Sequence, residues 1–115
     1  MKRSFVTAAL IAAFALSVAL PSQVLAWDLT GWEKADPARG QWGWFTGQSR
    51  KCEDKIPMPG HHTKAEWEKK FTTDKDKLPC GGAGISDRFV KHIFLFLQNH
   101  AKDSANPMVT RPEGC

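Results

Sequence analysis

Residues 86–102 read SDRFVKHIFLFLQNHAK and carry the strongest helical pattern in the chain. Phe89, Ile93 and Leu97 recur at intervals of four residues, which places them on one side of a helix. The apolar surface is so wide that the rest of the domain must cover it. We therefore predict a central helix over about 87–102, with these three side chains in the core.

A shorter helix is predicted upstream, over about 63–71. Thr63 and Glu66 have the spacing of a capping box, in which the hydroxyl and the carboxylate each accept a hydrogen bond from the other residue's backbone N–H. Trp67 and Phe71 lie four residues apart and share the face that we expect to be buried.

The ends of the longer helix also have recognisable signals. Ser86 is expected to cap its first turn, and Asp87 would favour the positive end of the helix dipole. Pro107 and Pro112 then predict that the tail, 104–115, wraps around the domain as coil.

Residues 27–50, WDLTGWEKADPARGQWGWFTGQSR, contain four of the five tryptophans. Their apolar positions fit neither a helical nor a strand period, so we predict an irregular segment with at most one turn of helix. Two roles remain open for the rings. They could fill the core of a small domain, or they could form an exposed platform for sugar, haem or a partner protein.

Residues 1–26 resemble a bacterial signal peptide. Lys2 and Arg3 precede an apolar run that is short for a membrane span, and Ala26 offers a cleavage site. We expect export to the periplasm or beyond, with 27–115 as one small mature domain and no membrane attachment after cleavage. An uncleaved N-terminal anchor is the alternative. Removing Lys2 and Arg3 reduces the formal charge of +4 to +2, which argues against a nucleic-acid partner.

Cys52, Cys80 and Cys115 are disulfide candidates in an oxidising compartment. We favour Cys52–Cys80, because the two residues flank the short helix, and its closed loop would contribute roughly 3–4 kcal/mol. Cys80–Cys115 is the rival pairing. In the favoured arrangement Cys115 would be free or would link two chains as a dimer. The predicted fold is thus a mainly α, disulfide-stapled domain with two principal helices.

Met58, His61 and His62 form the strongest candidate metal set, because thioether and imidazole ligands suit copper. Motifs for zinc binding, dithiol redox chemistry and nucleophilic catalysis are missing from the sequence. We therefore predict no catalytic residues and treat an enzyme without a recognisable site as the least favoured hypothesis.

Three stretches together resemble the second half of small bacterial class I c-type cytochromes. They are HHTKAEWEKKF at 61–71, LPC at 78–80 and FLQNHAKDS at 96–104. In that family a short helix is followed by a loop and a long C-terminal helix. The match covers about 61–104.

The resemblance implies a haem-less relative, because the chain contains no Cys-x-x-Cys-His for covalent haem. Cys52-Glu53-Asp54-Lys55-Ile56 stands where that motif would be expected. A noncovalent haem held by histidine and Met58 or Met108 is an alternative cofactor, as is copper. We expect a non-catalytic accessory protein that supports a periplasmic redox partner.

Overall fold

The computed structural model describes residues 27–113, and it is mainly helical with no strand in that range. The expected signal peptide (1–26) and Cys115 lie outside the described residues. Within 27–113 no helix has the length and apolar character to cross a membrane. The elements in chain order are η2 (Trp32–Lys34), α2 (Pro37–Trp42), η3 (Gly43–Gly47), η4 (Gln48–Arg50), η5 (Pro59–His61), α3 (Lys64–Thr72), η6 (Lys75–Lys77), η7 (Pro79–Gly82) and α4 (Val90–Asn99).

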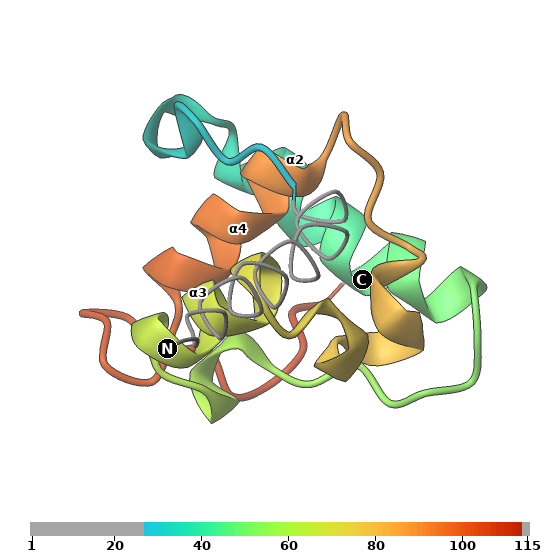
Figure 1. The fold of residues 1–115 in the computed structure, drawn as a ribbon. Helices are drawn as coiled ribbons and strands as arrows, with labels where there is room; N and C mark the ends of the chain where they lie inside the picture. Colours follow the sequence, from blue (N-terminus) through green and yellow to red (C-terminus); the bar gives the residue numbers. More distant parts are fainter. Residues whose placement is uncertain (1–26, 114–115) are drawn as a thin grey trace, which may run out of the picture.

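Helix α4 is the central element and packs against both α2 and α3 (Figure 1). It is shorter than predicted at both ends. The carbonyl of Ser86 accepts from the backbone N–H groups of Phe89 and Val90, but no side chain caps the helix, so the expected Ser86 hydroxyl cap is absent. A turn over 87–89 places Ser86 too far from the regular helix to cap it.

The C-terminal end of α4 stops at Asn99, where the tail folds back against it. The backbone N–H of Met108 donates to the His100 carbonyl at 3.0 Å, and His100 Nδ1 lies 2.8 Å from the carbonyl oxygen of Asn106. The tail then reaches the N-terminal half of the domain, where the Arg111 guanidinium donates to the Phe45 carbonyl. These hydrogen bonds hold the irregular tail against the domain.

Helix α3 begins as the sequence predicted. The Thr63 hydroxyl accepts from the Glu66 N–H at 3.2 Å, and the Glu66 carboxylate accepts from the Thr63 N–H at 2.8 Å, so the capping box is confirmed. Trp67 and Phe71 are fully buried on one face of this helix.

Residues 37–50 form a continuous helical run, α2–η3–η4, where the sequence predicted an irregular segment. The Asp36 carboxylate caps it by accepting from the Ala38 N–H, and Pro37 occupies the first turn. The apolar pattern was hard to recognise because glycines occupy contact positions. A Cβ on Gly40 would collide with the His92 backbone, and one on Gly47 would lie 2.7 Å from the Gly84 carbonyl oxygen. At these two contact positions the sequence therefore has a glycine instead of an apolar side chain.

One aromatic-rich core joins the three helices. Among the expected core residues, Trp67, Phe71, Ile93 and Leu97 are fully buried, whereas Phe89 is half-buried. Phe89 lies one residue before α4, where its ring contacts both Trp42 and the edge of the core. The buried apolar set comprises Trp44, Phe45, Trp67, Phe71, Leu78, Ile85, Val90, Ile93, Phe94, Phe96, Leu97 and Ala101.

Candidate functional site

Two tryptophan rings fill the space beneath the loop that precedes α3. Trp44 and Trp67 are fully buried and meet edge to face, with ring centroids 5.5 Å apart. Their indole N–H groups donate to the carbonyls of Pro57 at 3.0 Å and Pro59 at 2.8 Å. The two rings therefore bury a large apolar area and also satisfy backbone acceptors of the segment that leads through η5 into α3.

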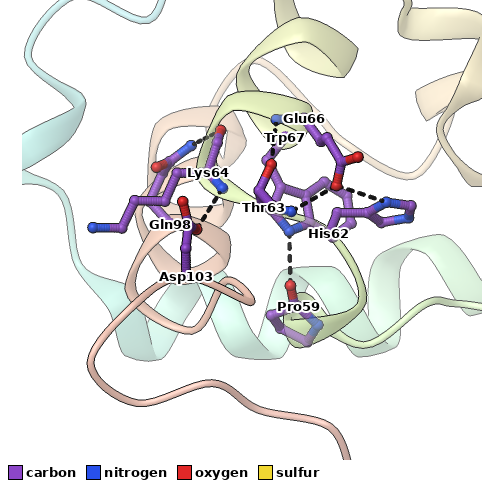
Figure 2. Close-up of polar contacts among 8 residues, drawn as sticks. All are labelled: Pro59, His62, Thr63, Lys64, Glu66, Trp67, Gln98 and Asp103. Carbon is purple, nitrogen blue, oxygen red and sulfur yellow. Dashed lines mark hydrogen bonds and ion pairs between the residues drawn. The ribbon is translucent and has the colours of Figure 1, made fainter.

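The loop continues into a polar network that ties α3 to the end of α4 (Figure 2). The Lys64 N–H donates to the Asp103 carboxylate at 2.8 Å, and Gln98 Nε2 donates to the Lys64 carbonyl at 2.9 Å. The His62 carbonyl accepts from the Lys102 N–H. These hydrogen bonds fix the position of the start of α3 relative to the end of α4.

His62 lies at the edge of this network. Its ring meets Trp67 edge to face at 4.9 Å, and its Nδ1 is 3.7 Å from Glu66 Oε1. Burial lowers the pKa of His62 below its ordinary 6.5, and Lys70 adds to the effect, although the Glu66 carboxylate opposes it. The Thr63 N–H lowers the pKa of Glu66.

Acidification should destabilise the fold through His62. Its pKa is lower in the folded protein than in the unfolded chain, so its contribution is complete above about pH 6.5 and is lost as pH falls through the folded pKa. Urea unfolding of the wild type and His62→Gln at pH 7.5 and 5.0 measures this. We expect the wild type to lose more stability than the variant, and equal losses would contradict the assignment.

The expected metal residues are placed in different surroundings. His61 lines an open groove, whereas His62 lines a separate hollow beside Glu66 and α3. Met58 is partly buried against the core, as is Met108, whose carbonyl accepts from the Gly60 N–H. The two imidazoles thus line different hollows.

The disulfide joins Cys52 and Cys80, with Cα atoms 5.7 Å apart, and this pairing was expected. Both cysteines are half-buried. The chain turns sharply after the second one, since Cys80, Gly81 and Gly82 all have positive φ. The Asp54 carboxylate accepts from the Cys80 N–H at 2.9 Å and fastens the two loops together beside the sulfur atoms.

A groove of about 570 Å³ opens beside the disulfide. Its walls are residues 54–57, His61 and residues 76–79, so it runs between the two loops that the disulfide joins. Acidic and basic side chains share its rim, including Asp54, Lys55, Asp76 and Lys77. Because Ile56, Pro57, Leu78 and Pro79 also line it, the groove is mixed in polarity as well as in charge.

A second, apolar hollow of about 270 Å³ lies on the outer face of α2. Ala38, Arg39, Trp42 and Phe89 line it. Trp42 is 52% exposed, and its ring centroid lies 5.8 Å from that of Phe89. The sequence left open whether the tryptophans are core or platform. The structure divides them, since Trp44 is buried, Trp27 and Trp32 are half-buried and Trp42 faces solvent.

Two residues near the disulfide were missed by sequence reasoning. Asp54 follows Cys52 by two residues, and that spacing by itself has no specific meaning. Gln48 is fully buried, and its side-chain carbonyl accepts from the Gly84 N–H at 3.1 Å. No specific signal in the sequence identified Gln48, because the turn that it contacts is 36 residues away along the chain.

No family model, curated protein or solved structure matches this chain.

Proposed function

We propose that this protein is an exported, non-catalytic accessory module that docks onto a redox protein of the periplasm. The observation that carries the proposal is the surface formed by Ala38, Arg39, Trp42 and Phe89, which we call the α2 patch. Tryptophan and arginine are among the residue types most enriched at the positions that contribute most binding energy in protein interfaces.

The interior supports a binding role rather than a cofactor-carrying role. Trp44 and Trp67 occupy the core, and both of their N–H groups donate to loop carbonyls. The imidazoles of His61 and His62 line different hollows. The accessory function therefore depends on the surface of the domain. The redox character of the partner rests on the cytochrome resemblance and on the expected export.

The backbone beneath the α2 patch is held in place by capping and packing contacts. Helix α2 is capped by Asp36, and its inner face packs against α4 through Gly40. The Asp36 N–H donates in turn to Nδ1 of His92 on α4, at 2.9 Å. An aromatic anchor on such a support loses little conformational freedom on binding.

The test is recovery of a partner with the tagged protein from the periplasm of its own host. We expect a protein that carries haem, flavin or a reactive dithiol to be recovered with the wild type and lost with Trp42→Ala. Loss of a tryptophan anchor costs about 2 kcal/mol or more, which corresponds to roughly thirtyfold in Kd.

Val109→Ala is the matched control, because Val109 is a similarly exposed apolar side chain, at 57%. Its partner recovery should equal that of the wild type. Equal recovery with Trp42→Ala would contradict the role of the α2 patch. A Soret band in the purified protein itself would instead favour the alternative of a noncovalent haem carrier.

A further inference from the structure

Three ligand atoms of types that bind metals meet where the two disulfide-linked loops join. The sulfur atoms of Cys52 and Cys80 and a carboxylate oxygen of Asp54 all lie within 4.8 Å of one another. In the part of the chain that the structure describes, this is the group of cysteine, histidine and acidic side chains that could hold an ion. It includes none of Met58, His61 and His62.

The carboxylate is held in position by the backbone. Asp54 Oδ2 accepts from the Cys80 N–H at 2.9 Å, and the Asp54 N–H donates to Cys52 Sγ at 3.4 Å. Asp54 is thus attached to both cysteines by bonds that do not depend on an ion. This arrangement holds the carboxylate beside the two sulfur atoms.

The chemistry of the three ligand atoms suits a metal ion. Two cysteine sulfurs and one carboxylate oxygen are ligand types that bind Zn²⁺, and a divalent cation offsets the mutual repulsion of these groups.

We infer that the reduced form of this group binds one thiophilic divalent cation, with Zn²⁺ as the natural choice. A dithiol supplies two electrons and two protons, which convert the Cys52–Cys80 disulfide to two thiols while the dithiol becomes a disulfide. The cation then displaces one proton from each thiol and is held by the two sulfurs and Asp54. The inference does not depend on the proposed docking function.

Metal binding at this site depends on the oxidation state of Cys52 and Cys80. In the disulfide form the sulfur atoms carry no charge, so Asp54 is left as the sole anionic ligand. In the reduced form three protein ligands hold the ion and leave one tetrahedral position to solvent, as in open zinc sites. Asp54 also lines the groove beside the disulfide, so solvent reaches the site from that side.

The experiment is a titration of the purified protein with Co²⁺ and then Zn²⁺, before and after reduction with a phosphine. We expect the reduced protein to bind one Co²⁺ with thiolate-to-metal absorption, which Zn²⁺ displaces, and the oxidised protein to bind none. Asp54→Asn, which can still accept from the Cys80 N–H, should weaken binding about tenfold or more. Cys52→Ser should abolish the absorption.

Met58→Leu and His62→Gln are the controls and should bind like the wild type. Binding that is lost in these variants, or that is unchanged in Asp54→Asn, would overturn the assignment. If circular dichroism shows that reduction unfolds the chain, Zn²⁺ should refold the wild type but refold Asp54→Asn only at higher concentration. Failure of Zn²⁺ to restore the wild-type fold would also overturn it.

Discussion

Replacing Gly40 with alanine is expected to lower the free energy of unfolding by about 3 kcal/mol or more. An added Cβ would lie 2.5 Å from the His92 carbonyl carbon, closer still to its oxygen, and 2.8 Å from Phe96 Cβ. Backbone and Cβ atoms cannot turn aside as a flexible side chain can. The helix pair α2–α4 would have to separate, which would open the core. Urea denaturation followed by far-ultraviolet circular dichroism measures the loss.

Gly43→Ala is the matched control in the same helical run. Its nearest contact would be the terminal methyl of Ile93 at 3.1 Å, which can shift slightly. Alanine also favours a helix over glycine by about 0.5–1 kcal/mol, so this change should be close to neutral. Similar losses for Gly40→Ala and Gly43→Ala would contradict this explanation, because they would show that the close backbone contact at Gly40 is not what makes its replacement costly.

Trp67→Ala is expected to cost about 3–5 kcal/mol, because it removes a fully buried ring from the centre of the core. The ring contacts Trp44 and His62, and its Nε1–H bonds to the Pro59 carbonyl. Its loss would leave a cavity and would free the loop before α3. In a domain of this size most of the stability would be lost. Urea unfolding at pH 7.5 provides the measurement.

Two further variants separate the causes of that loss. Trp67→Phe keeps an aromatic ring but removes the indole donor, so the Pro59 carbonyl retains only the long 3.5 Å bond from the His62 N–H, and the change should cost about 1–3 kcal/mol. Trp42→Ala removes a half-exposed tryptophan and should cost about 1 kcal/mol or less. If Trp42→Ala destabilised the protein as much as Trp67→Ala, the α2 patch would be part of the core and unsuited to docking.

Local signals correctly predicted the elements whose stabilising contacts are close in sequence. The capping box at Thr63 and Glu66 involves residues three apart, so α3 began where the sequence placed it. The apolar repeat of α4 identified the central helix, although a turn before Val90 and a tail folded onto His100 shortened it. The pairing of Cys52 with Cys80 was also predicted, since both flank the same short helix.

The sequence by itself determined a mainly helical, aromatic-rich domain with one disulfide, because capping, apolar periodicity and cysteine spacing are properties of neighbouring residues. Tertiary structure decided the rest. Helix α2 depends on Gly40, whose lack of a side chain matters because the backbone of α4 lies against it. The exposure of Trp42 and the position of Asp54 beside the sulfurs likewise depend on segments distant in sequence. Such contacts produce no repeating pattern in the sequence, because each one joins a single residue to a segment that is distant along the chain.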